Sequence, residues 1–370
     1  MKNTASAKLW LAFSALSLIN VLFGYKYLER YTVWAGLVTA LVFVFQLAVF
    51  YYRTHPIFNN WLYFLPRIGI FVLLAFLTYV HMYFPVQGLN VDRWSVISSF
   101  WEAAFAGEYP YFAQSHMGNP PGPLPMYFVM ALPFHLLGEL AVLSLIGYAL
   151  WFSRKLFKPG YWLVVLLLSS FFMYWEILTR SNIFTNAVLV VLLLIGMEKE
   201  IHRKSRLSLW WAIPAGLLLS TRSIFALAYI PFFLFYLRNG SISFGRLALF
   251  TALTVTVLGL TLLPFILLFP EEWSQLNPFI IQSTFLMPQG YGLLFIALAV
   301  AFGFLLRQAF DIYLSVGMAL FVSILVYSVY HIANRGFQTA YFESSIDISY
   351  YIFSVPFLLY YLHRITTQKV

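Results

Sequence analysis

The stretch RLALFTALTVTVLGLTLLPFILLF, residues 246–269, carries a single charged residue, at its start. A helix of this length crosses the roughly 30 Å hydrocarbon layer of a bilayer, because all its backbone hydrogen bonds are satisfied within the helix. Apolar stretches of about 17 to 25 residues, the range that suits a span, recur from one end of the chain to the other. The chain is 62% hydrophobic and 9% charged, whereas a soluble domain has about 25% charged residues. The sequence therefore predicts an all-α polytopic membrane protein.

Composition and charge exclude several other classes of protein. The chain has no cysteine, which excludes structural disulfides and metal sites built from cysteine. Its net charge of +9 does not indicate nucleic-acid binding, because Lys and Arg are dispersed in short loops. No A-x-A cleavage motif follows the first apolar run. Residues Leu9 to Gly24 are therefore expected to stay as a first span rather than to be removed as a signal peptide.

Twelve spans are expected within one integral membrane domain, residues 1–370. They are placed at 9–24, 33–52, 62–84, 139–153, 160–177, 182–197, 208–221, 224–237, 246–269, 291–306, 309–330 and 346–362. Loops rich in Lys and Arg face the cytoplasm. With the N-terminus inside, the cytoplasmic side receives Lys2, Lys8, Arg53, Arg154, Lys155, Lys158, Lys199, Arg203, Lys204, Arg206, Arg238, Arg246, Arg307, Arg364 and Lys369.

Most acidic residues fall on the outer side of this topology: Asp92, Glu102, Glu108, Glu139, Glu176, Glu271, Glu272, Glu343 and Asp347. The arrangement requires that 121–138 not cross the membrane. The prolines of this segment, including Pro133, favour a helix that lies at the outer interface or dips into it. The expected protein resides in the inner cell membrane with both termini in the cytoplasm. It consists of N-terminal spans (1–84), an outer catalytic loop (85–138) and the remaining spans (139–370).

The outer loop contains NVDRWSVISSFWEAAFAGEYPYFAQSHMGNPPGPLPMYF, residues 90–128. From Asp92 onward it reads as an amphipathic helix that Gly107 ends. One face carries the apolar side chains Trp94, Ile97, Trp101 and Phe105, and the opposite side carries Asp92, Ser95, Ser99 and Glu102. A helix with tryptophans on one face lies in the headgroup region of a bilayer. Asp92 therefore stands at the start of an interfacial helix, where it either takes part in chemistry or acts as an N-cap.

Several short motifs follow one another in this region: Asp92, AFAGEYPY at 104–111, GNPPGPLPMYF at 118–128 and ALPFHLLGEL at 131–140. Their order and the topology resemble those of the GT-C membrane glycosyltransferases that use polyprenyl-phosphate sugars, most nearly the bacterial polyprenyl-phosphate-mannose-type mannosyltransferases. The resemblance covers about 90–230. It implies a GT-C-like bundle of about 12 transmembrane helices. It also implies transfer of a sugar, mannose favoured, from a polyprenyl-phosphate donor to an acceptor hydroxyl at the outer membrane face, with no cofactor. The acceptor would be a glycolipid, a glycan or a protein.

The resemblance also implies roles for residues of the outer loop. In the family an acid of this loop acts as general base, and that position maps to Asp92. Many relatives carry a second acid beside it, where this chain has Arg93. The substitution argues against a divalent metal, because hard cations need several oxygen ligands. We therefore expect a metal-independent, inverting enzyme in which Arg93 holds a phosphate or anchors a lipid headgroup. Five more residues of the loop are expected to contact the substrate: Glu102, Tyr109, Tyr111, His116 and Asn119.

Two outer turns supply further candidates. In YWEILTRSNIFTNA, residues 174–187, Arg180 is a candidate ligand of the donor phosphate, and Glu176 and Asn182 are candidate substrate contacts. The alternative is a local Glu176–Arg180 pair at i, i+4. In the second turn, Arg222 would neutralise the donor phosphate as it leaves, unless it is a simple interfacial arginine.

The last outer loop, 328–346, adds Arg335 as a third candidate phosphate ligand. It also adds His331 as a candidate substrate contact, although a lone His at a helix end more often caps or packs. The outer segment 268–292 mixes acids and aromatics. We expect it to cover the site or to bind the acceptor or the lipid tail.

Two other classes of protein stay open. A transporter or flippase would carry ionisable residues near the bilayer midplane and internal repeats. Here the polar residues gather at the outer interface, and Asp311 lies near the cytoplasmic end of its span. The other class is a GT-C-fold protein without activity that acts as a scaffold or subunit.

Overall fold

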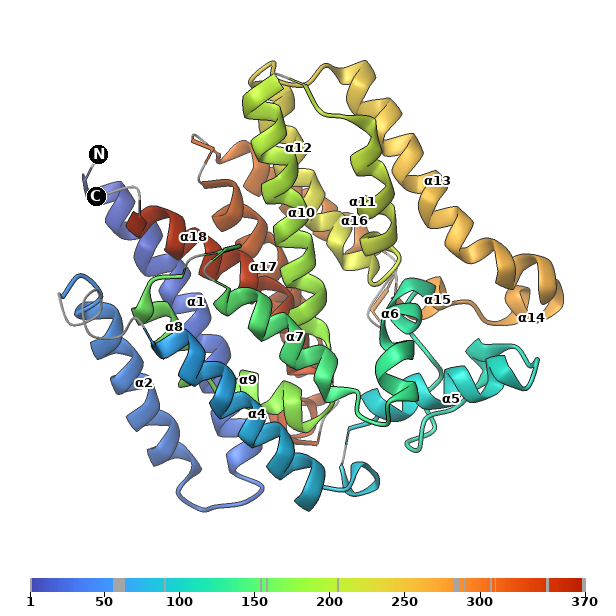
Figure 1. Cartoon of the computed structure of the whole chain (residues 1–370), viewed down its shortest axis with the longest axis horizontal. Helices are drawn as coiled ribbons and strands as arrows, with labels where there is room; N and C mark the ends of the chain where they lie inside the picture. The colour runs from blue at the N-terminus through green and yellow to red at the C-terminus, as the bar shows by residue number, and fades with distance from the viewer. Residues whose placement is uncertain are drawn as a thin grey trace.

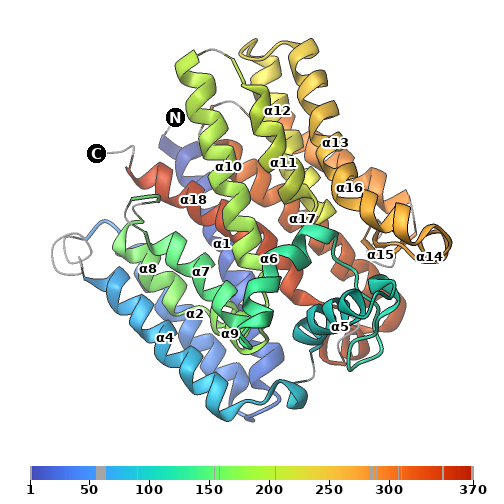
Figure 2. The ribbon, with the colours of Figure 1, turned by 45° about the vertical axis from the view of Figure 1, so that its right-hand side comes forward.

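The computed structural model describes residues 2–55, 64–89, 91–153, 155–157, 159–204, 206–282, 287–288, 290–306, 308–309, 311–343 and 346–367. Within these ranges every regular element is a helix. The longest helices form a bundle, and α5, α6, α14 and α15 gather to one side of it in both views (Figure 1 and Figure 2). The prediction of an all-α chain is confirmed for this part of the protein.

Each of the twelve stretches predicted as spans contains helix. They correspond in order to α1 (Lys2–Leu28), α2 (Ala35–Tyr51), α4 (Leu65–Tyr83), α7 (Ala141–Phe152), α8 (Tyr161–Leu168) with α9 (Phe171–Leu178), α10 (Ile183–Lys204), η3 (Leu209–Trp211) with α11 (Ala212–Leu219), η4 (Ser223–Phe225) with α12 (Ala226–Arg238), α13 (Phe244–Leu268), α16 (Gly290–Phe304), α17 (Asp311–Arg335), and η6 (Ile348–Ser354) with α18 (Val355–Thr367). The connecting segments contain η1 (Val86–Gly88), α5 (Arg93–Phe105), η2 (Pro110–Phe112), α6 (Pro125–Leu136), α14 (Pro270–Gln275), α15 (Pro278–Gln282) and the π-helical turn η5 (Gln338–Phe342).

Four of the described helices are long and apolar enough to cross a membrane by themselves: Ser6–Leu28, Leu65–Tyr83, Phe244–Leu268 and Asp311–Arg335. The number rises to six if each of two bent helix pairs counts as one span. Shorter apolar helices such as α12, with 13 residues, extend only about 20 Å at 1.5 Å per residue. The structure therefore supports a multi-pass membrane protein with four to six such spans.

The segment expected not to cross the membrane bends sharply. Helix α6 has 12 residues, about 18 Å of helix, and meets α7 at an angle of 108°. Gly138, at φ +82°, lies at this bend in the left-handed region that glycine adopts without a Cβ clash. Helix α6 thus does not continue the direction of α7.

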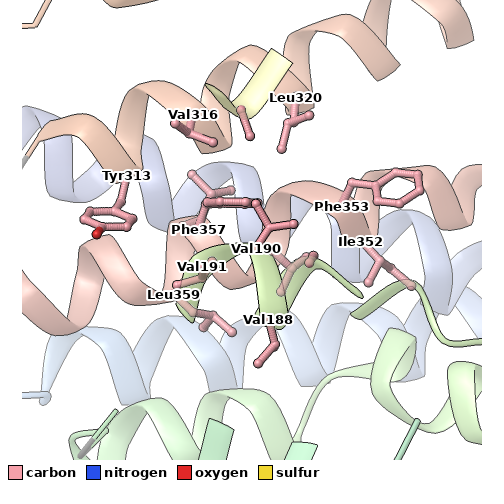
Figure 3. Close-up of a cluster of buried hydrophobic side chains, with 14 of the residues drawn as sticks. Val188, Val190, Val191, Tyr313, Val316, Leu320, Ile352, Phe353, Phe357 and Leu359 are labelled. Atoms are coloured by element: carbon pink, nitrogen blue, oxygen red, sulfur yellow. The ribbon is translucent and has the colours of Figure 1, made fainter. Parts of the chain in front are cut away.

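The main hydrophobic core lies where α10, α17 and the α18 region meet. Figure 3 shows side chains from the three elements interleaving there, among them Val191, Leu320 and Phe357. Gly317 of α17 lets the backbones come close, since a Cβ at this position would lie 2.7 Å from a Leu358 methyl group. Small residues at helix contacts are typical of membrane bundles, where van der Waals packing drives helix association.

A second, smaller core joins the outer loop to α13. Phe100 of α5 stacks on Phe128 of α6 with ring centroids 3.7 Å apart, and Phe265 of α13 packs beside them. Solvent exposure along α5 does not follow the two predicted faces. Phe105, expected on the apolar face, is 64% exposed. Ser95, expected on the polar face, is buried, because the packing against α6 and the following loop decides which side is covered.

Charged groups pair at the end of the bundle where α1 begins. Lys8 of α1 and Asp311 of α17 form an ion pair of 2.6 Å, and Arg364 of α18 pairs with Glu198 of α10 at 2.7 Å. Lys26 stands 18 positions after Lys8 on the same helix, about 27 Å away at 1.5 Å per residue. The two ends of α1 are thus separated by nearly the roughly 30 Å thickness of a hydrocarbon core.

Candidate functional site

A cavity of about 430 Å³ opens at the Lys26 end of the bundle. Its wall comes from the end of α1, the start of α5, the loop 117–123, α6, η4, α17 and η6. Ligand pockets typically measure about 300–1,000 Å³, so the cavity has room for a sugar and a phosphate group. The charged residues that line it are Lys26, Arg30, Asp92, Arg93, Arg222 and Asp347.

The Asp92 carboxylate is fixed by the loop and does not cap α5. Asp92 occupies the N-cap position, but its side chain forms no capping hydrogen bond. Instead, Oδ2 accepts hydrogen bonds from Ser115 Oγ at 2.8 Å and from Asn119 Nδ2 at 2.7 Å. Both bonds fall on one oxygen, so Oδ1 has no hydrogen-bond donor among the described residues. The capping alternative is wrong, and Asp92 presents one carboxylate oxygen that is available to a ligand.

A tight turn positions the two donors to Asp92. The Ser115 amide donates to the Asn119 carbonyl oxygen at 2.9 Å, and the Asn119 amide donates back to Ser115 Oγ. Gly118 closes the turn at φ +79°, in the left-handed region where glycine is favoured. This turn follows the GEYPY segment and precedes the double proline, so the chain path through both motifs determines where Asp92 is held.

Arg222 lines the cavity and forms no ion pair with the acidic residues that the structure describes. It precedes η4, and its guanidinium lies over the Tyr127 ring with Cζ 4.9 Å from the ring centroid. Its Nε is buried and has no hydrogen bond within the described part of the chain. Because a guanidinium carries five N–H donors and a buried charge is costly without a partner, Arg222 is suited to bind an anion in this cavity.

Arg93 is held in an ion pair and is not positioned to bind a ligand. Its side chain is buried, and it donates to Asp347 Oδ2 at 2.5 Å and to Ser181 Oγ at 2.9 Å. Burial by itself would raise the pKa of Asp347, but the Arg93 guanidinium and the hydrogen bonds from Ser349 hold that pKa below its ordinary value. The pair ties the start of α5 to the loop that precedes η6, and so fixes the neighbouring Asp92. The sequence places Asp347 only among the expected outer acids and predicts no role for it.

The end of α1 contributes cavity residues that the sequence analysis missed. Lys26 is 1% exposed and donates to the Ile346 carbonyl oxygen at 3.0 Å. Tyr27 stacks on Trp175 with centroids 3.5 Å apart, and the Arg30 guanidinium lies 5.1 Å from the Tyr27 ring. The sequence does contain a signal for these residues. Lys26 and Arg30 follow the first span, and they are cations on the side where the charge pattern places mostly acids.

Four candidates of the outer loop do not line the cavity, although Asn119 does. His116 bonds to Ser95 Oγ at 2.7 Å and to the Leu89 carbonyl oxygen at 3.1 Å, so it holds the loop together. The Tyr109 hydroxyl donates to the Leu276 carbonyl oxygen at 2.8 Å. Tyr111 is fully buried in the smaller core, and Glu102 is exposed on α5.

The turn between α9 and α10 is a structural network rather than a part of the cavity wall. Glu176 accepts hydrogen bonds from the Ile183 and Phe184 amides at the start of α10. Arg180, at φ +54°, lies 3.3 Å from Glu139 and donates to the Leu178 carbonyl oxygen. The predicted Glu176–Arg180 pair is therefore wrong, because Glu176 caps a helix. Asn182 is buried, and its side-chain oxygen accepts a hydrogen bond of 3.4 Å from the side-chain amide of Asn186.

The two candidates on α17 also lie outside the cavity lining. His331 is buried, with its ring packed edge-on against Tyr327 at 4.8 Å and Tyr330 at 5.3 Å. Arg335 is exposed at the last turn of the helix. Of the candidates named from the sequence, the cavity brings together Asp92, Arg93, Asn119 and Arg222.

Comparison with models of known protein families, with curated proteins and with solved structures finds no match for this chain. Among the residues that the structure describes, no three His, Asp or Glu side chains gather closely enough to hold a metal ion. The functional assignment therefore depends on the chemistry of the lining residues.

Proposed function

We propose that the protein is a GT-C-type glycosyltransferase of about twelve membrane helices that moves a sugar, mannose favoured, from a polyprenyl-phosphate donor to an acceptor hydroxyl. One observation carries the proposal. One cavity holds Asp92, whose Oδ1 accepts no hydrogen bond from the described residues, and Arg222, which pairs with none of the described acidic residues. A base and a phosphate ligand are the two groups that transfer from a lipid phosphate requires.

The proposed reaction is a single displacement. Asp92 Oδ1 takes the proton of the acceptor hydroxyl as that oxygen attacks the anomeric carbon. The bond from the anomeric carbon to the phosphate oxygen breaks, and its electron pair leaves with the polyprenyl phosphate, so the anomeric centre inverts. General base catalysis of this type contributes about 10²- to 10⁴-fold. Arg222 stabilises the negative charge that develops on the leaving phosphate. Because its guanidinium already lies in the cavity wall, little reorganisation is needed when that charge forms.

The proposed site lies at the outer face of the inner membrane, with both termini in the cytoplasm. Lys8 and Lys26 lie about 27 Å apart along α1. This distance supports a cavity about one hydrocarbon thickness from the end of the bundle where α1 begins. The outer assignment follows from the excess of Lys and Arg in the loops of that opposite end. A donor phosphate held at headgroup depth would then meet Asp92 and Arg222, while its polyprenyl chain stays in the bilayer.

A transporter is less well supported by the distribution of charge. Substrate sites in secondary transporters lie near the bilayer midplane between structural repeats. The charged lining residues here gather at one end of the bundle, and Asp311 is paired with Lys8 at the other end.

The deciding experiment is a transfer assay on the full chain reconstituted in nanodiscs. Polyprenyl-phosphate mannose is supplied with membrane-lipid extract as acceptor, and the glucose and arabinose donors are tested in parallel. We expect release of polyprenyl phosphate with one donor. Donor binding without release would indicate an inactive scaffold, and movement of intact donor between the leaflets of vesicles would indicate a flippase.

A further inference from the structure

The ring of Tyr127, on α6, lies against the side chain of Arg222. The ring centroid is 4.9 Å from Arg222 Cζ, within the roughly 6 Å over which an aromatic face attracts a cation. Tyr127 lines the cavity but is only 1% exposed, so its ring offers little area to a ligand. A carboxylate partner would occupy N–H donors of the guanidinium. An aromatic face instead stabilises the charge and leaves those donors for an anion.

A backbone contact fixes the positions of Tyr127 and Arg222 relative to each other. The Met126 amide, at the start of α6, donates to the Ser220 carbonyl oxygen at 3.1 Å and to Ser220 Oγ at 3.3 Å. Amides in the first turn of a helix have no partner within the helix, so Ser220 satisfies a donor that α6 leaves open. Met126 directly precedes Tyr127, and Ser220 lies two positions before Arg222. The contact therefore brings the ring to the guanidinium.

The turn that carries Arg222 is also anchored to α13. Ser220 Oγ lies 2.7 Å from Thr261 Oγ1, and Thr261 donates to the Leu258 carbonyl oxygen at 2.7 Å. Ser220 is buried, so its bonds to α6 and α13 are shielded from water. With the backbone held on both sides, the freedom that remains to Arg222 is that of its long side chain. The Tyr127 ring restricts this freedom.

The segment that ends in Tyr127 begins at a residue that holds Asp92. Asn119 donates to Asp92 Oδ2 at 2.7 Å, and Tyr127 stands eight positions further along the chain. Each proline in between locks its own φ angle. These prolines are Pro120, Pro121, Pro123 and Pro125. The stretch 119–127 thus connects the proposed base to the proposed phosphate ligand through a stiff chain path.

Building on the proposed role of Arg222 as ligand of the donor phosphate, we infer that Tyr127 is the positioning residue of that site. Its ring holds the guanidinium in the cavity wall before the donor arrives. Less side-chain freedom is then lost when the phosphate binds, and this raises the affinity. Tyr127 acts through Arg222 and contributes no group to the reaction. Its effect should therefore appear in phosphate binding and should require Arg222.

The test measures binding of geranyl phosphate, a water-soluble prenyl phosphate, to the full chain in phosphatidylcholine nanodiscs by isothermal titration calorimetry. We expect Tyr127→Leu and Tyr127→Met each to weaken binding about tenfold, as for loss of a cation–π contact shielded from water. Tyr127→Phe keeps the aromatic face and should bind within about twofold of the unmodified protein. Geraniol, which has the same chain but no phosphate, should respond to none of these substitutions.

A double-mutant cycle separates positioning from direct contact with the ligand. Arg222→Gln should weaken binding strongly, because a charge-assisted contact to phosphate is lost. Tyr127→Leu added to Arg222→Gln should weaken it no further, since no guanidinium is left to position. Phe128→Leu is the matched control. It removes the next ring of α6, which is also buried but stacks on Phe100 and does not line the cavity. It should lower the thermal unfolding temperature and leave the affinity for geranyl phosphate unchanged.

Several results would overturn the role of Tyr127. Additive losses in the double variant would mean that the ring contacts the ligand itself. An equal loss in Phe128→Leu would point to the packing of α6, and an equal loss in Tyr127→Phe would point to the hydroxyl. Unchanged binding in Tyr127→Leu protein that still transfers sugar would remove the role of Tyr127 and leave the proposed function. The expected binding pattern in protein that transfers no sugar would support the role of Tyr127 and remove the proposed function.

Discussion

Replacing Asp92 with Asn tests the proposed base while changing little else. Asn has the same shape as Asp, and its single amide oxygen can accept the hydrogen bonds from both Ser115 and Asn119. The capping geometry of α5 is not at risk, because the Asp92 side chain forms no capping bond. What disappears is a carboxylate oxygen able to take a proton. The substitution therefore separates chemistry from architecture at this position.

The structure indicates how much Asp92→Asn should change the folding free energy and how much it should change the transfer rate. The two hydrogen bonds to Asp92 become neutral rather than charge-assisted, a loss of about 1 kcal/mol in folding free energy given that Asn119 is exposed. Loss of a general base costs at least about a hundredfold in rate, which corresponds to about 2.7 kcal/mol of transition-state stabilisation. We therefore expect a folded protein that binds donor normally and transfers sugar at least about a hundredfold more slowly.

The assay is single-turnover transfer at saturating donor, with donor affinity measured separately on the same nanodiscs. Glu108→Gln is the matched control, because it removes an exposed carboxylate of the same loop that does not line the cavity. Its transfer rate should equal that of the unmodified protein. Folded, donor-binding Asp92→Asn protein with full transfer activity would refute the role of Asp92 as base.

Four further predictions concern the donor site, stability and topology. Substituting Arg222 by Lys should weaken donor use strongly, because a point charge does not reproduce the two-pronged guanidinium contact to a phosphate; unchanged donor affinity and turnover in Arg222→Ala would show the role to be wrong. Glu176→Gln should lower the thermal unfolding temperature, since the charged acceptor of the first α10 amides is lost at a cost of about 1–3 kcal/mol; an unchanged temperature would contradict this. Because the folded-state pKa of Asp347 is lowered from 3.8, its stabilisation is present above that pH and is lost as the pH falls through the lowered value. The stability difference between the unmodified protein and Asp347→Asn should therefore be seen at pH 7 and shrink at strongly acidic pH; a difference that persists there would exclude an ionic cause. In this cysteine-free chain, a cysteine at Met117 should react with an impermeant reagent in intact cells and one at Arg203 should not, while the reverse pattern would invert the topology.

The helices and two of the residues that line the cavity could be predicted from the sequence. Apolar runs such as 246–269 predict helices because backbone hydrogen bonds in lipid must close within the segment, and that requirement is local. Asp92 and Arg222 could be named because each lies in a short motif at a position where the expected topology leaves a polar residue at an interface. The sequence does not give the lengths of the helices, because only tertiary packing shows which apolar runs break. The run that forms α8 and α9, for example, bends by 58° between them.

Only the tertiary structure decided which charges meet. Lys26 and the Ile346 carbonyl oxygen are 320 positions apart in sequence, and Arg93 and Asp347 are 254 apart. Such pairings depend on the register and crossing angles of α1, α5 and η6, which no periodic pattern encodes. The same packing keeps Arg180 out of the cavity lining. Arg180 lies beside Glu139, and Glu176 caps α10 instead of pairing with Arg180. The sequence by itself determined that this is a helical membrane protein with one long polar segment between its apolar runs. The fold decided that the end of its first helix supplies part of the cavity, because helix packing brings together side chains that the chain keeps far apart.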